Sequence, residues 1–367
     1  LRRWVDRGVI PGAPKKSGPA HPWPPIAVAH ARIVARLRER GHSFDEIRRA
    51  TEEGRLAFGY VEELLPEVQG SAKLKQVAKD TGLQPALIQR IYTTLGFSAD
   101  ATEHLGQEDA EMLGHIAAVL AAGFPLAAFL QLIRVYGQSI AQIADAEVRL
   151  FHLYVHEPLM RDGVPGLEVA EQMGDLTKQL VPLSGPVMEQ IHRRYLHHFI
   201  EQDIVGHMEA EVGEAAAELG RMRTAIAFAD LAGYTQLTEQ QGDEEAASIV
   251  ERFIADVSHT LPDEARIVKT IGDEVMLVSS DPSALSDWAV GFQALVGGRP
   301  VPRIGLHVGE VLYRDGDYYG REVNLAARVA ARAAAGEVLV TRAIVDLAEP
   351  HQQFEFIGEV KLKGFNE

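Results

Sequence analysis

Two aspartates stand where short apolar runs of the sequence end, and their carboxylates can bind metal ions. Asp230 follows the run 224–229 and precedes a turn with Gly233, and Asp273 follows Gly272 between two further apolar runs. A carboxylate at a strand end can hold a metal ion, and the N-terminus of a following helix presents backbone N–H groups to phosphate. Taken singly, Asp230 is explained about equally well as a helix N-cap. Asp273 alone is well explained as part of a hairpin turn.

As a pair, the two aspartates indicate more specific chemistry. Two adjacent strands can bring Asp230 and Asp273 together, and paired carboxylates at strand ends are what a two-Mg²⁺ phosphoryl-transfer site requires. Glu274 directly follows Asp273, so its side chain would point to the opposite face of the strand. We therefore predict a divalent-metal site formed by Asp230 and Asp273, with Glu274 as a poorer ligand.

A third set of polar residues lies in the segment 317–328. Asn324 and Arg328 are four positions apart, so both lie on one face of the predicted helix. A guanidinium beside an amide suits a phosphate and a ribose, although either residue alone would be interpreted as a surface residue. No protein general base is evident, and His307, in a strand-like run, is predicted to be a packed or surface histidine.

Together these pieces resemble the catalytic domain of the class III nucleotidyl cyclases over residues 222–367. Six positions match that family in residue type, order and spacing. The residues that the resemblance implies are Asp230 and Asp273 for two Mg²⁺ or Mn²⁺ ions, Lys269 and Asp317 for adenine, Asn324 for the ribose and Arg328 for the α-phosphate.

The lysine and aspartate of this set indicate the substrate. A lysine donor and an aspartate acceptor are complementary to the N1/N6 edge of adenine, whereas guanine presents donor and acceptor reversed. The expected activity is adenylyl cyclase, with ATP as substrate. The resemblance also implies a homodimer with two shared sites, in which the metal aspartates come from one chain and the other four residues from its partner. Lys363 is a further candidate contact for phosphate.

The region around these residues has the pattern of an α/β domain. After Gly220, short apolar runs alternate with helical periodicity, and a tight strand pair surrounds residues 272–273. This predicts a ferredoxin-like α/β sandwich. The expected strands cover residues 224–229, the two sides of 272–273, 303–308, 336–340 and 354–362, and the expected helices cover 242–260, 283–296 and 322–334.

The preceding half of the chain has a different sequence pattern. Six prolines between positions 11 and 25 predict an extended arm, and residues 26–180 show helical patterning without strand-like alternation. From Pro186 an apolar stripe at three- to five-residue steps predicts a helical linker, with Gly206 and Gly213 as points where it can break. The predicted domains are an all-α regulatory domain at 1–185 with an arm at 1–25, a helical linker or switch at 186–220, and a cyclase domain at 221–367.

This layout resembles the regulatory region of the autoinhibited, pH-sensing mycobacterial adenylyl cyclases. Histidine changes charge between about pH 5 and 8, and protonation of histidines beside an acidic run can favour one linker conformation over another. An ordinary exposed helix explains these histidines equally well. The candidate sensors in or beside the linker are His192, His197, His198 and His207.

Composition excludes several classes of protein. The 367 residues carry a formal net charge of −16 and no cysteine, which argues against general nucleic-acid binding and excludes disulfides and thiolate metal sites. The absence of cysteine suits a cytoplasmic protein. The uncharged segment 116–133 is long enough for a membrane span, but Pro125 in its middle favours two short buried helices. These apolar runs suit core packing better than an apolar ligand such as a fatty acid.

Two other functions remain open from the sequence. The segment 74–90 has helix-turn-helix spacing around Gly82, which allows a DNA-binding regulator with a nucleotide-sensing domain. A catalytically inactive ATP-binding dimerisation module is the second alternative. The complete set of six cyclase residues argues against it.

Overall fold

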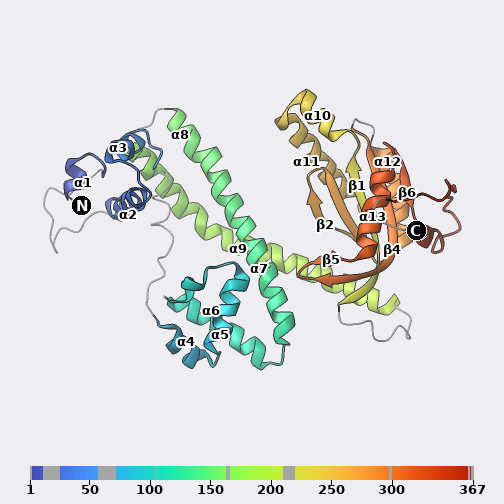
Figure 1. Ribbon diagram of the computed structural model, residues 1–367, viewed down its shortest axis with the longest axis horizontal. Helices are drawn as coiled ribbons and strands as arrows, with labels where there is room; N and C mark the ends of the chain where they lie inside the picture. Colours follow the sequence, from blue (N-terminus) through green and yellow to red (C-terminus); the bar gives the residue numbers. More distant parts are fainter. Residues whose placement is uncertain are drawn as a thin grey trace. The chain divides into compact units, whose positions relative to one another are not determined.

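The computed structural model describes residues 2–10, 25–56, 72–103, 105–162, 166–209, 220–296, 300–362 and 364. The chain divides into two compact units, Leu1–Arg194 and Tyr195–Glu367. One long helix, α9 (Gly166–Glu209), crosses the boundary between them. Each unit is described separately below (Figure 1).

The first unit is helical throughout its described residues, with one isolated bridge between Ala72 and Leu105. Ser43 caps α3 and forms a capping box with Glu46, and Gly82 and Gly96 end two helices in the left-handed conformation. The expected all-α region is therefore confirmed. Its other elements are α1 (Arg2–Asp6), α2 (Pro25–Glu39), α3 (Phe44–Glu52), α4 (Leu74–Thr81), α5 (Pro85–Leu95), the 3₁₀ turn η2 (Ala99–Thr102), α6 (Gln107–Ala121), α7 (Leu126–Phe151), the π-helical turn η3 (His152–His156) and α8 (Glu157–Arg161).

The N-terminal segment corrects the expectation of an extended arm. Residues 2–6 form α1, and Val9 and Ile10 are buried in a small core with α2 and α3. The prolines that suggested an arm start at Pro11 and lie in 11–24, outside the described residues, or at the start of α2. The short apolar stretch before them packs because burying Val9 and Ile10 stabilises folding whatever the neighbouring composition.

The uncharged segment near residue 120 forms two helices, as predicted, but they are not short and buried: α7 has 26 residues, and residues 121–128 are exposed. Helix α6 ends at Ala121, Gly123 adopts a left-handed conformation, and Pro125 precedes the first turn of α7. Among the described residues, no helix combines the length and the apolar character needed to cross a membrane.

Helix α9 differs from the linker expected to open at Pro186. It starts at Gly166, includes Pro182 and Pro186, and continues through Gly206, so Gly206 does not break it. Each proline removes one backbone hydrogen bond, and prolines four apart leave both gaps on the same helix face. Gly213 lies outside the described residues.

The second unit contains an α/β fold built on one sheet, which confirms the predicted fold class. The strand order is β2-β3-β1-β4-β5 with antiparallel neighbours, and β6 pairs parallel to β4. Its elements are β1 (Arg221–Leu231), α10 (Tyr234–Gln241), α11 (Asp243–Thr260), β2 (Ala265–Ile271), β3 (Glu274–Ser279), α12 (Pro282–Leu295), β4 (Pro302–Arg314), β5 (Asp317–Tyr319), α13 (Arg321–Arg332), β6 (Val338–Val340) and α14 (Arg342–Val345).

The expected strand at 354–362 is wrong. These residues form no strand, and Phe356 is 85% exposed. An alternating apolar pattern becomes a strand only where a neighbour pairs with it and buries one face, and this segment has neither.

Two hydrophobic cores lie on the two faces of the sheet. Helices α11 and α12 cover one face through Phe253 and Phe292, and α13 covers the other through Ala326 and Ala330. Alternation along β1 divides its side chains between the two cores. The sheet and its helices thereby fix where each strand end and each loop lies.

Candidate active site

Asp230 and Asp273 meet at one end of the sheet. Asp230 lies near the end of β1, opposite Glu274 of β3 in the antiparallel register, and Asp273 occupies the β2–β3 turn. Burial, a hydrogen bond with the Asp230 side chain and the Asp230 charge raise the pKa of Asp273 to about 7. Burial and the same charge also raise the pKa of Glu274. Two adjacent carboxylates favour a proton or a cation between them, and hard oxygen ligands of this kind suit Mg²⁺ or Mn²⁺.

Arg303 is a charged partner of Asp230 that the sequence reasoning missed. It stands opposite Asp230 in the pairing of β1 with β4, and its Nε donates to Asp230 Oδ2 over 2.8 Å, with a second bond from Nη2. This guanidinium balances the aspartate charge. Arg303 is 73 positions from Asp230, so only the strand register identifies the pair.

Lys269 and Asp317 also come together within one chain. Lys269 Nζ donates to Asp317 Oδ2, although β2 and β5 stand at opposite ends of the strand order. The sheet must therefore curl to bring its two outer strands into contact. The backbone N–H of Tyr318 donates to the other Asp317 oxygen over 2.8 Å, which orients the carboxylate.

A second contact joins the same two strands and adds a helix. Arg266 of β2 donates from Nη2 to the Tyr318 hydroxyl over 2.5 Å. Its guanidinium lies 5.5 Å from the centre of the Tyr318 ring and 5.3 Å from that of Phe199, on α9. Such cation–π contacts are favourable where the cation is partly desolvated. The end of α9 that belongs to the second unit therefore touches the strand that carries Lys269.

Asn324 and Arg328 lie on the exposed face of α13, while Val323 and Ala326 face the sheet. In the described part of the chain, neither side chain makes a hydrogen bond or an ion pair. The structure thus brings Asp230 to Asp273 and Lys269 to Asp317, but it links Asn324 and Arg328 to neither pair.

Three of the four predicted sensor histidines have exposed side chains among the described residues. His192, His197 and His198 are exposed on α9. The backbone of His207 is helical, but its side chain lies outside the described residues, as does Lys363.

The sequence reasoning did not predict that two histidines of the helical unit are buried, because burial depends on packing and not on local sequence. His30 Nε2 lies 3.1 Å from Thr51 Oγ1, and burial lowers the pKa of His30 to about 4. His156 donates from Nε2 to the Gly54 carbonyl over 3.0 Å, and burial lowers the pKa of His156 as well. Both contacts lie at the C-terminal end of α3.

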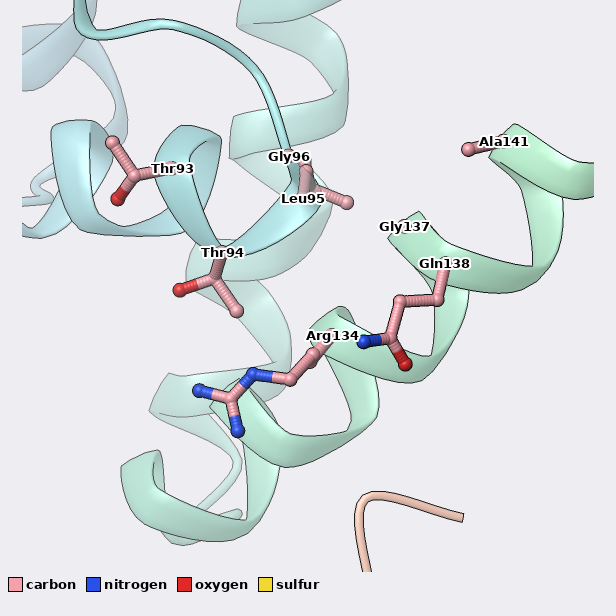
Figure 2. Close-up of a pocket in the computed structure, with 8 residues that line it drawn as sticks. All are labelled: Thr93, Thr94, Leu95, Gly96, Arg134, Gly137, Gln138 and Ala141. Carbon is pink, nitrogen blue, oxygen red and sulfur yellow. The ribbon is translucent and has the colours of Figure 1, made fainter. Parts of the chain in front are cut away.

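A cavity of about 390 Å³ lies in the helical unit, between the end of α5 and α7. Figure 2 shows Arg134 and Gln138 projecting from α7 beside the end of α5, where Thr94 lies. The lining combines these polar groups with Leu95 and Ala141, and an apolar ligand such as a fatty acid stays a prediction. The described residues contain no group of three or more His, Asp or Glu side chains placed to hold a metal ion.

Known proteins match both units. The family described as "Adenylate cyclase regulatory domain" matches residues 27–200, and "Adenylate and Guanylate cyclase catalytic domain" matches residues 300–367. The pH-sensitive adenylate cyclase MT1302 of Mycobacterium tuberculosis is 30% identical over 346 residues, which cover 91% of this chain and 85% of that protein. This chain belongs to the class III adenylyl cyclases.

This cyclase is also similar to another bacterial adenylate cyclase and to a solved adenylyl cyclase structure. An adenylate cyclase of Glutamicibacter nicotianae is 25% identical over 352 residues, covering 91% of this chain and 83% of that protein. The crystal structure of adenylyl cyclase CyaB from P. aeruginosa aligns with 40% of this chain and 90% of its own, at 22% identity and a TM-score of 0.36.

The family assignment bears on the alternative functions. The catalytic part is an adenylate cyclase domain of a family that uses divalent metals. The helix-turn-helix spacing near 74–90 corresponds to α4 and α5, which lie inside the regulatory-domain match. Ile88, Ile91 and Tyr92 of α5 are buried in the helical core, so this face of α5 packs against its neighbours.

Proposed function

We propose that this cyclase converts ATP to 3′,5′-cyclic AMP and pyrophosphate, with two divalent cations, at two sites formed between the chains of a homodimer. The observation that carries the proposal is the meeting of Asp230 and Asp273, close enough to share a proton. Carboxylates held this close repel each other unless a proton or a cation lies between them.

Within this proposal the chain's own residues have distinct roles. Asp230 and Asp273 would hold the metal ions, which when bound lower the pKa of the ribose 3′-hydroxyl and neutralise phosphate charge. Arg328 stabilises the charge that develops on the α-phosphate, and Asn324 orients the ribose by hydrogen bonding. No side chain is assigned as a general base.

The Lys269–Asp317 pair supports ATP as the substrate. Its lysine can donate to adenine N1 and its aspartate can accept from the N6 amino group. In the free chain the two side chains neutralise each other. The pair therefore stays charge-balanced until the base replaces that contact.

The exposed face of α13 supports a shared site. Asn324 and Arg328 are exposed, with no side-chain partner among the described residues of their own chain. In a symmetric dimer, two copies of this face can each meet the aspartates of the opposite chain, which gives two identical sites.

Regulation belongs to the helical unit in this proposal. The domains would be 1–185, the linker 186–220 and the cyclase domain 221–367, with activity autoinhibited and responsive to pH. The name of the mycobacterial relative supports pH as the signal. His192, His197, His198 and His207 remain the candidate sensors in the linker.

The direct test is cyclic nucleotide formation by the full chain from ATP and from GTP, with Mg²⁺ or Mn²⁺ and with a chelator, between about pH 5.5 and 8. We expect cyclic AMP from ATP only when metal is present, a GTP rate at least about tenfold lower, and a steep pH profile. ATP binding without turnover at any pH would replace the proposal with the inactive ATP-binding module.

A further inference from the structure

His307 lies beneath the helix that carries Asn324 and Arg328. It is 5% exposed on β4, with Nε2 2.6 Å from Glu322 Oε2 and Nδ1 2.8 Å from Thr341 Oγ1. Because a carboxylate can only accept, Nε2 donates to Glu322. Burial lowers the pKa of His307 and favours the neutral ring, so Nδ1 accepts from the Thr341 hydroxyl.

Glu322 places this interaction in the first turn of α13. The helix begins at Arg321, and Glu322 precedes Asn324 by two positions and Arg328 by six. The Glu322 side chain is 23% exposed. A hydrogen bond to a charged partner in such a site is stronger than one at the surface.

Two glycines on either side of His307 bring α13 directly onto β4. Gly305, His307 and Gly309 point to the same face, since side chains alternate along a strand. A Cβ at Gly305 would lie 2.0 Å from the Ala330 nitrogen, and one at Gly309 would lie 2.7 Å from Glu322 Cγ. Backbone contact thus fixes the C-terminal half of α13, and the His307–Glu322 bond fixes its first turn.

We propose that His307 and Glu322 are a positioning pair that sets the height and rotation of α13 on the sheet, and through them the directions of Asn324 and Arg328. The inference rests on the proposed function for the roles of those two residues. His307 acts through the helix. In the described part of the chain it makes no contact with the aspartate pair. A misplacement of about 1 Å at reacting groups can lower a rate about 100-fold.

The test compares substitutions that remove or retain the bond. His307→Leu fills the volume but loses both hydrogen bonds, and we expect kcat for cyclic AMP formation to fall about 10- to 100-fold. KM for ATP and the preference for ATP over GTP should stay unchanged, because Lys269 and Asp317 are not on α13. His307→Gln keeps an amide donor toward Glu322 and should recover kcat to within about threefold of wild type.

The matched control is His351→Leu. His351 Nε2 pairs with Asp287 Oδ2 at 2.8 Å in the same unit, but this exposed pair does not involve α13. We expect its kcat to equal that of wild type. If His307→Leu lowers the melting temperature or the dimer content, Glu322 is substituted instead. Glu322→Leu then removes the hydrogen bond to His307, and Glu322→Gln retains it.

A combined variant decides whether His307 acts through α13. In an Asn324→Ala/Arg328→Ala chain both side chains to be positioned are gone, so His307→Leu should lower the residual kcat by less than about threefold. Three outcomes would each overturn the pair. They are losses in kcat that multiply fully in the combined variant, an unchanged kcat in folded His307→Leu, and a change confined to KM. Wild-type enzyme that forms no cyclic AMP would refute the proposed function instead.

Discussion

The two units of this cyclase place their charged groups in different ways. In the cyclase unit, Asp230 pairs with Arg303, Lys269 with Asp317, and His307 with Glu322, and each pair joins different elements. In the helical unit most ion pairs join residues three or four apart on one helix, such as Arg149 with Asp145 and Arg193 with Glu189.

The difference indicates which ion pairs can position groups for chemistry. A pair along one helix forms whenever the helix forms and contributes a few tenths of a kcal/mol. A pair between strands distant in sequence exists only in the finished fold, so it can position groups for chemistry. The helical unit has long-range polar contacts of this kind at His30 and His156.

The largest effect is expected at the aspartate pair. Asp273→Ala removes one of two converging carboxylates, and we expect cyclic AMP formation to fall at least about 1,000-fold. Size-exclusion chromatography should show an unchanged dimer, because Asp273 lies in a turn outside the hydrophobic cores. Activity near that of wild type would refute the metal assignment.

Mixing two inactive variants tests whether the site is shared. Chains with Asp273→Ala and chains with Arg328→Ala each lack a complete site, but a heterodimer contains one. After dissociation and random reassociation of equal amounts, about half of the dimers are heterodimers, each with one of two sites, so activity should recover to about a quarter of wild type. Heterodimers that form but stay inactive would contradict the shared geometry.

The buried histidines make the helical unit sensitive to acid. The pKa of His30 is about 4 in the folded chain and about 6.5 when unfolded. Below about pH 6.5 the unfolded chain therefore binds a proton more readily than the folded chain does. The free energy of unfolding has its full value above about pH 6.5 and falls by up to about 3 kcal/mol as the pH drops to about 4. His156, near His152 and Glu157, shifts in the same direction.

Thermal denaturation of the full chain between about pH 7 and 5 measures this loss. His30→Gln cannot titrate, so its melting temperature should depend less on pH than that of wild type. The exposed His192→Gln serves as the control and should keep the wild-type slope. Equal slopes for His30→Gln and wild type would exclude His30 as the cause.

The smallest effect is expected at a local pair. Arg193→Ala breaks the exposed 2.6 Å contact with Glu189 on α9 and should lower the free energy of unfolding by no more than about 0.5 kcal/mol. Chemical denaturation would detect a larger loss. A loss of several kcal/mol would mean that Arg193 has a tertiary partner and would weaken the contrast between the units.

The sequence predicts residues whose position follows from local pattern. Asp230 and Asp273 could be found because both follow apolar runs, and Asn324 and Arg328 because helix periodicity places them on one face. The roles of all six cyclase residues stay predictions, including those whose side chains the fold brings together.

The sequence does not predict what depends on register or burial. Arg303 meets Asp230 only through the alignment of β1 with β4, and His30 is buried only because α2 packs on α3. For the same reason α1 was missed, and an apolar pattern at 354–362 was wrongly assigned to a strand.

The contacts of Arg266 affect how the kinetics of a catalytic fragment should be interpreted. The same guanidinium contacts Phe199 of α9 and the Tyr318 ring, and Tyr318 directly follows Asp317. A catalytic fragment that begins at Arg221 would leave one side of Arg266 open to water, beside the strand that carries Lys269. The kinetics of such a fragment would include this local change, so comparison with the intact protein would mix it with the loss of the helical unit.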